Sequence, residues 1–152
     1  MRRTAQRQLR AYVFVSNGKI EVATTVDGRK YVQAFISFKN FGQTPGNEFR
    51  TRAKAEIQAV SFMPDHESKP GEDRSIIGPT AGADVNVVFG PVSEEILTEV
   101  RTGTKRIFVW GRLDYIDVFG QPRYLQFREE NGRLRADGIS WPIQPLGKYE
   151  AN

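Results

Sequence analysis

The sequence predicts an all-β domain: an antiparallel, immunoglobulin-like β-sandwich of about seven strands with one short inserted helix. Three observations predict this class. Apolar and polar side chains alternate with a period of two along several segments, turn residues separate these segments at close spacing, and one segment carries convincing helix signals. The Cys…Trp…Cys pattern of antibody domains is absent, because the chain has no cysteine. A small barrel is the alternative architecture.

Two segments show the strand pattern most clearly. In residues 31–39, YVQAFISFK, one face is apolar and the other is polar. In residues 49–62, FRTRAKAEIQAVSF, the side chains of Ala53, Ala55 and Ile57 are expected to face the core. A helix would scatter the charges of this segment around its axis, so the period of two favours a strand. Further strands are expected at residues 11–15, 20–24, 85–89, 106–116 and 123–129.

The segment 106–116 is apolar on both faces, which is typical of a central strand. We expect its second face to be covered by the helix or by the N-terminal arm. Trp110 lies in the middle of this strand and is expected to be a core residue rather than a ligand-stacking one.

The connections carry ordinary turn and helix signals. Asn17-Gly18 and Asp27-Gly28 are the residue pairs that favour tight hairpin turns. The helix is expected to begin after Ser93 as N-cap and to end at Gly103. The polar, breaker-rich segment 64–75 is expected to be a mobile surface loop.

The segment FGQTPG, residues 41–46, raises the choice between a phosphate-binding loop and a turn. A phosphate-binding loop would precede a helix, but a strand pattern follows here. The turn interpretation gives each residue a role. Asn40 hydrogen-bonds locally or adopts left-handed geometry, Phe41 caps the core, Gly42 supplies a positive φ and Pro45 fixes its φ.

Length and composition indicate one domain of 152 residues with a net charge of +4. We divide it into a basic N-terminal arm or juxtamembrane linker (residues 1–10), the β-sandwich domain (11–147) and a C-terminal tail (148–152). The absence of cysteine excludes disulfides and thiolate metal sites, and the single histidine argues against a histidine-rich site. The apolar runs are too short for a membrane helix, so the chain as given is expected to be soluble.

The best functional feature is a cationic row on the predicted strand 49–62. Arg50, Arg52 and Lys54 would project from one face about 7 Å apart, close to the spacing of phosphates. Tyr31, Phe35 or Tyr124 would supply aromatic neighbours for single-stranded nucleic acid. The simpler interpretation is a solvated face balanced by acids such as Glu56, and the modest net charge argues against a dedicated nucleic-acid domain.

The N-terminal arm adds further cations, among them Arg7 and Arg10. Such an arm can contact nucleic-acid phosphates or lipid headgroups, although a solvated, frayed terminus is the simpler interpretation.

An acidic hairpin is the candidate for catalysis. Its carboxylates, Asp114, Asp117, Glu129 and Glu130, could bind a cation or act as acid and base. Hairpins more often pair such groups with arginines across the strands, here Arg112, Arg123 or Arg128. The loop residues Asp65, His66 and Glu67 are consecutive and therefore poorly placed for a metal site. The sequence thus predicts no catalytic, cofactor-binding or metal-binding residue, and no enzyme.

Several phrases resemble a family of uncharacterised bacterial membrane-anchored proteins: QRQLRAYVFV, VQAFISFKNFGQTPG, RTGTKRIFVWGRLDYIDVFGQPRYLQFR and WPIQPL. The resemblance spans nearly the whole chain. It implies one or two N-terminal transmembrane helices followed by a domain of this kind, with Met1 as a start or a truncation point after a missing anchor. The side of the membrane stays undetermined. The family has no assigned activity, so no site residues carry over. Gly46 departs from the alanine usual in the family.

Three functional hypotheses follow. The first is a non-enzymatic, immunoglobulin-like interaction module, tethered to a bacterial membrane and binding a protein or envelope component through a sheet edge or loops. The alternative is nucleic-acid or anionic-lipid binding through the basic sheet face and the arm. The third is a hydrolase that uses the acidic hairpin.

Overall fold

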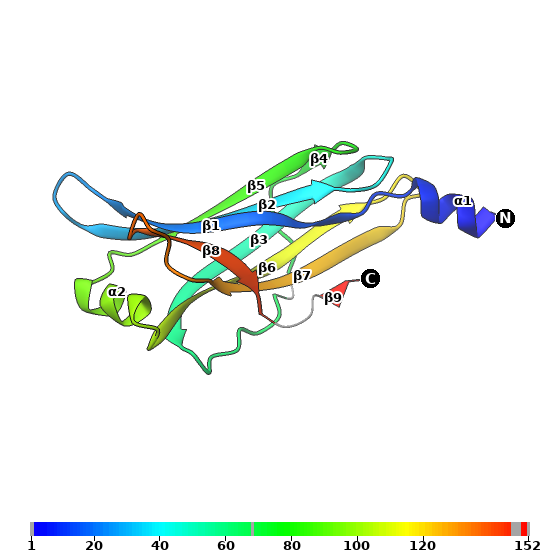
Figure 1. Cartoon of the computed structure of the whole chain (residues 1–152). Coiled ribbons are helices and arrows are strands. Elements are labelled where there is room, and N and C mark those ends of the chain that lie inside the picture. Colours follow the sequence, from blue (N-terminus) through cyan, green and yellow to red (C-terminus); the bar gives the residue numbers. More distant parts are fainter. Residues whose placement is uncertain (1, 68, 147–149, 152) are drawn as a thin grey trace.

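The computed structural model describes residues 2–67, 69–146 and 150–151, which form a strongly curved antiparallel sheet with a helix at each end (Figure 1). In chain order its elements are α1 (Arg2–Leu9), β1 (Val13–Thr24), β2 (Lys30–Asn40), β3 (Gly46–Ala59), β4 (Ser75–Ile77), β5 (Gly82–Phe89), α2 (Glu94–Arg101), β6 (Lys105–Ile116), β7 (Pro122–Asn131), β8 (Ser140–Pro145) and β9 (Glu150–Ala151).

The strands are hydrogen-bonded in the order β4-β3-β6-β7-β8-β1-β2-β5, and β9 pairs with β7. Every neighbouring pair is antiparallel. The sheet bends back on itself so that β5 comes to lie near β3, which makes the architecture nearly a barrel. The all-β, antiparallel prediction is therefore confirmed. The immunoglobulin-like subdivision into two sheets stays a prediction.

The core fills the space inside the curved sheet. The inner row of β2, Val32, Ala34, Ile36 and Phe38, is at most 1% exposed, and the inner residues of β3 pack against the same cluster. The ring of Phe38 meets Phe127 on β7 edge to face, with centroids 5.3 Å apart, so opposite walls of the sheet touch. The period-two alternation is confirmed for residues 31–39 and 49–59, whereas residues 60–62, which were predicted to continue the second strand, lie beyond the end of β3.

The N-terminal strand differs from the prediction of two strands joined at Asn17-Gly18. β1 is a single strand that continues through this pair with a β-bulge between Val15 and Asn17. Gly18 is needed there for space, because a Cβ would lie 2.6 Å from the carbonyl oxygen of Phe35 on β2. The predicted turn at Asp27-Gly28 is confirmed, and Gly28 has a φ of +85°.

Described residues near both chain ends form regular secondary structure, which was not expected. Most of the basic arm, residues 1–10, forms α1, and the Tyr12 hydroxyl donates to the carbonyl of Arg7 at 2.8 Å. In the predicted tail, residues 148–152, the pair Glu150–Ala151 forms β9, while the other positions lie outside the described residues. In the part of the chain that the structure covers, neither helix has the length and apolar character needed to cross a membrane.

The predicted inserted helix is confirmed as α2. The side chain of Ser93 accepts a hydrogen bond from the Ile96 amide at 3.3 Å, and Leu97 and Val100 are buried. Gly103 follows the C-cap with a φ of +87°, as expected of a helix stop.

Asn40 organises the turn at residues 41–46. Its side chain, which is 0% exposed, accepts from the amides of Tyr12 and Gly42 and donates to two carbonyls, at Thr44 and Ile77. The Asn40 side chain thus serves the fold, as the turn interpretation predicts. Two details were wrong. Gly42 is required for space rather than for a positive φ, since a Cβ would lie 2.7 Å from the Cα of Ala11, and Phe41 is 57% exposed rather than a cap on the core.

Candidate functional site

The predicted cationic row lies on the outer face of β3, and the neighbouring strands extend it. Arg52 is opposite Arg112 on β6, and Lys54 is opposite Trp110. The Arg112 guanidinium binds both carboxylate oxygens of Asp114, at 2.7–3.0 Å, and its carbon lies 4.6 Å from the centre of the Tyr124 ring. Of the predicted aromatic neighbours, only Tyr124 lies on these strands.

Tyr31 and Phe35 are on β2, in the other wall of the sheet, so their predicted place beside the row was wrong. The arm residues make separate contacts. The Arg10 guanidinium stacks on Tyr12, 4.5 Å from the ring centre, and Arg7 is exposed on α1.

Residues 60–67, which we call the strap, cover this outer face. The ring of Phe62 meets Phe108 and Trp110 edge to face, at centroid distances of 5.2 and 6.0 Å. Further along, the carboxylate of Glu67 lies 3.1 Å from Lys54 Nζ, and its backbone carbonyl accepts from the Gln126 side chain at 3.0 Å. β6 is therefore a central strand covered on both faces, but the strap covers it rather than the helix or the arm.

The expected mobile loop, residues 64–75, is instead packed against the sheet in part. Pro64, Glu67 and Gly71 are buried. A Cβ on Gly71 would lie 2.6 Å from the carbonyl carbon of Thr51, so the loop lies directly against the backbone of β3. The physical reason is the topology: β4 pairs with the beginning of β3, so this connection must return along the whole length of β3.

Glu67 provides the negative charge in the contact between the strap and the sheet. Its side chain is 7% exposed and faces Lys54 and Arg52 of β3 and Arg112 of β6. Burial alone would raise its pKa, but hydrogen bonds from Lys54 and from the Lys69 amide, with the charges of Lys54 and Arg52, hold the pKa below its ordinary value of 4.5. The pKa of Arg112 is raised, mainly through its hydrogen bonds to Asp114.

This pKa shift predicts a pH-dependent contribution to stability. A carboxylate with a lowered folded-state pKa stabilises the fold fully above the unfolded value, near 4.5, and loses that contribution as the pH falls through the folded value. We expect the free energy of unfolding of Glu67→Gln to lie about 1–2 kcal/mol below wild type at neutral pH. The difference should vanish at pH values well below 4.5. Urea unfolding of both proteins across this range measures it; a difference that persists in acid would contradict the assignment.

The four carboxylates of the acidic hairpin do not converge. Asp114 binds Arg112, Asp117 accepts from Arg123 Nε at 3.1 Å, and the remaining outer carboxylate, Glu130, binds Arg106 at 2.9 Å. The side chain of Glu129 belongs to the opposite, inner row of β7 and is 1% exposed. Three of the four thus pair with an arginine, but the predicted cross-strand arrangement with a predicted arginine is confirmed only for Asp117 with Arg123. Asp114 pairs with Arg112 on its own strand, and Glu130 pairs with Arg106 instead of Arg128. Among the described residues, no three His, Asp or Glu side chains gather into a possible metal site.

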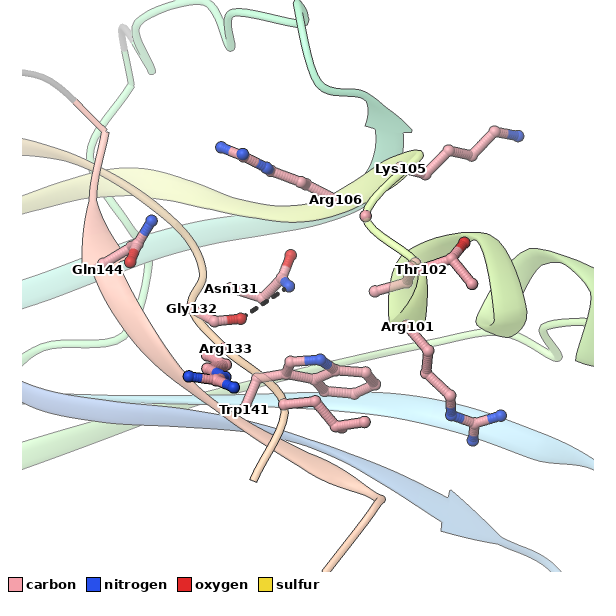
Figure 2. A pocket seen from close by; sticks show the side chains of 12 residues that line it. Arg101, Thr102, Lys105, Arg106, Asn131, Gly132, Arg133, Trp141 and Gln144 are labelled. Carbon is pink, nitrogen blue, oxygen red and sulfur yellow. Dashed lines mark hydrogen bonds between the residues drawn. The ribbon is translucent and has the colours of Figure 1, made fainter. Parts of the chain in front are cut away.

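A cavity of ≈ 440 Å³ opens at the C-terminal end of α2, with Trp141 of β8 in its wall (Figure 2). Cationic side chains surround it, but Lys105 and Arg106 extend away from one another, as Figure 2 shows. Three of the cations face carboxylates: Arg101 with Glu94 at 3.5 Å, Lys105 with Glu99 at 3.0 Å and Arg106 with Glu130 at 2.9 Å. This arrangement does not present a convergent anion site.

The end of the sheet that carries α1 has a different surface. The β2–β3 connection and the β6–β7 hairpin lie at the same end (Figure 1). Here large apolar side chains are between 38% and 57% exposed: Leu9, Phe14, Phe41, Val118 and Phe119. The most exposed aromatic side chains among the described residues, three phenylalanines, belong to this group.

Cations lie among these apolar groups. Lys39 Nζ is 5.5 Å from the ring centre of Phe41, and Arg10 lies over Tyr12. Within residues 2–67, 69–146 and 150–151, none of Arg7, Arg10 and Lys39 forms an ion pair. We call these apolar and cationic residues the α1-end surface.

The apolar part of this surface was not predicted, although the sequence carries a signal for it. Phe41-Gly42 and Phe119-Gly120 each place a large apolar residue inside a turn sequence, where a polar residue is usual. The strap has no comparable signal, because Phe62 and Glu67 acquire their partners only when the loop returns along β3.

No protein-family model, curated protein or solved structure matches the chain. The resemblance to membrane-anchored bacterial proteins therefore stays a prediction.

Proposed function

We propose that the chain is a non-enzymatic interaction module that rests against an anionic membrane surface through the α1-end surface. The proposal includes three further points. The fold is immunoglobulin-like, the chain is tethered to a membrane as in the family that it resembles, and its other faces bind a protein or an envelope component.

One observation carries it: the exposed phenylalanines gather at one end together with cations that have no acidic partner in the described chain. Apolar side chains on loop tips gain free energy by entering the headgroup region, and each nearby Lys or Arg adds roughly 1 kcal/mol on an anionic leaflet. An apolar patch without cations would fit a neutral protein surface better. The cations without an acidic partner therefore favour an anionic membrane surface.

The second candidate, binding of nucleic acid by the basic row, has less support from the geometry. Lys54 already binds Glu67, Arg112 binds Asp114, and Trp110 is covered by Phe62. The row therefore offers no open stacking platform.

Sedimentation with lipid vesicles tests the membrane proposal. At low salt we expect binding to vesicles of phosphatidylcholine and phosphatidylglycerol, weaker binding to phosphatidylcholine alone, and release as salt rises. In the double variant Phe41→Ser/Phe119→Ser, binding should fall at least tenfold, since burying one such side chain is worth about 1.5–3 kcal/mol.

The matched control is Val26→Ser/Ile139→Ser, which removes two exposed apolar side chains at the α2 end of the sheet. This control should bind vesicles like wild type. An equal loss in both double variants, or no binding to anionic vesicles at low salt, would overturn the proposal and leave a protein partner as the occupant of this surface.

A further inference from the structure

The strap lies on the outer face of β3, β6 and β7 in the manner of a bound peptide. It has no regular secondary structure, and it is attached through an aromatic side chain and, five positions later, a carboxylate. A ring nitrogen of His66, between them, lies 2.8 Å from Arg128 Nη2. Phe62 lies against the aromatic pair Phe108 and Trp110, and Glu67 enters the group of cations formed by Lys54, Arg52 and Arg112.

Two guanidinium groups on the face beneath the strap keep a donor that is not used. Arg52 and Arg112 are opposite one another in the β3–β6 register, but Asp114, which binds Arg112, and Glu67, which lies near both, offset this pair of like charges. In the described part of the chain, two guanidinium nitrogens of this face, Nε of Arg50 and Nε of Arg128, are buried without a hydrogen-bond acceptor. Buried donors without acceptors are uncommon in folded proteins, so a segment with one more acceptor, such as a second carboxylate, would satisfy this face better.

Most residues of the strap are not buried. Of its eight residues, only Pro64 and Glu67 are buried, and the remaining side-chain contacts, which Arg128 of β7 makes with a ring nitrogen of His66 at 2.8 Å and with the sulfur of Met63 at 3.7 Å, are exposed. Ordering an irregular segment costs conformational entropy at every residue, so a segment with so few buried groups opens at a small fraction of the free energy of global unfolding.

We propose that the outer face of β3, β6 and β7 is a peptide-binding site that the strap occupies in cis, and that its ligand in trans is an extended acidic segment of a partner protein with an aromatic residue ahead of a carboxylate. The aromatic residue would replace Phe62 on Trp110, and the carboxylate would replace Glu67 at Lys54. This site is separate from the α1-end surface and stands without the membrane proposal. A peptide is favoured over nucleic acid because the strap itself is a peptide seated there, with its backbone carbonyl hydrogen-bonded to Gln126.

The experiment uses the full chain and a synthetic peptide with the strap sequence VSFMPDHE, followed by nuclear magnetic resonance of the Lys54 and Gln126 signals and the Trp110 indole. In the variant Phe62→Ser/Glu67→Gln the strap loses the contacts of Phe62 and Glu67 and keeps that of His66 with Arg128, while the face beneath it is unchanged. We expect this variant to bind the peptide at least tenfold more tightly than wild type does. A peptide with glutamine in place of its glutamate should bind at least tenfold more weakly. Adding Lys54→Ser should abolish binding, whereas the control Lys19→Ser, which removes a similarly exposed lysine on β1, should not.

Several results would overturn the proposal. Equal binding by wild type and by the strap variant would show that the strap does not occupy the site, and no binding by the folded variant would show that there is no site. Tighter binding of single-stranded oligothymidylate than of the peptide would assign the face to nucleic acid instead. If Phe62→Ser prevents folding, Glu67→Gln alone carries the same comparison, with thermal unfolding confirming that it is folded.

Discussion

Replacing Asn40 with aspartate is expected to destabilise the protein by at least about 3 kcal/mol at neutral pH. The substitution keeps the shape of the side chain but removes both amide hydrogens. The carbonyl oxygens of Thr44 and Ile77, now 2.8 and 3.2 Å from Nδ2, would then face a carboxylate oxygen in a fully buried place. Because the same side chain joins the start of β1 to the β2–β3 turn and to β4, no local rearrangement can satisfy all four partners.

Urea unfolding measures this loss, and its pH dependence gives a second check. Burial raises the pKa of the new carboxyl, so the deficit should shrink as the pH falls and the protonated acid regains a donor. The matched control is Asn17→Asp, an exposed asparagine on β1 whose side-chain oxygen accepts from the adjacent Gly18 amide. It should stay within about 0.5 kcal/mol of wild type. Equal losses at the two positions would contradict the role assigned to Asn40.

The local alternation of side chains predicted much of the fold. In residues 31–39 and 49–59, successive side chains of a strand point to opposite faces of the sheet. The face of each side chain therefore follows from the local sequence and does not depend on distant partners. The β1 segment shows where this reasoning ends. Asn17-Gly18 has the composition of a tight turn, but pairing with Ser37 and Ile36 of β2 keeps the chain extended, and tertiary pairing outweighs turn propensity.

The candidate sites were less predictable, since each depends on contacts between segments far apart in the sequence. The cationic row was found from its spacing, but its neutralisation by Glu67 depends on the return path of the chain along β3. β8 was missed because Pro142 and Pro145 interrupt the pattern of a strand, which proline usually excludes from a sheet interior. It nevertheless contributes the fully buried Trp141 to the core.

Contacts with distant segments also explain why β6 needs a glycine at position 111, where residues of β3 and β7 leave no space for a side chain. We expect Gly111→Ala to cost more than about 3 kcal/mol, or to prevent folding, because overpacking against backbone cannot be relieved by a change of rotamer. A Cβ there would collide with the Arg52 carbonyl oxygen and lie 2.8 Å from Cζ of Phe127 and 2.9 Å from Cα of Ala53. Arg52 and Ala53 belong to β3 and Phe127 belongs to β7, and both strands pair with β6, so a shift that made room for the Cβ would break backbone hydrogen bonds between β6 and one of them. Gly78→Ala is the matched control, since its Cβ would meet only Ala81, at 3.8 Å. Thermal unfolding should place the control within a few degrees of wild type, whereas similar shifts for the two variants would mean that β3 and β6 are less closely packed at Gly111 than described.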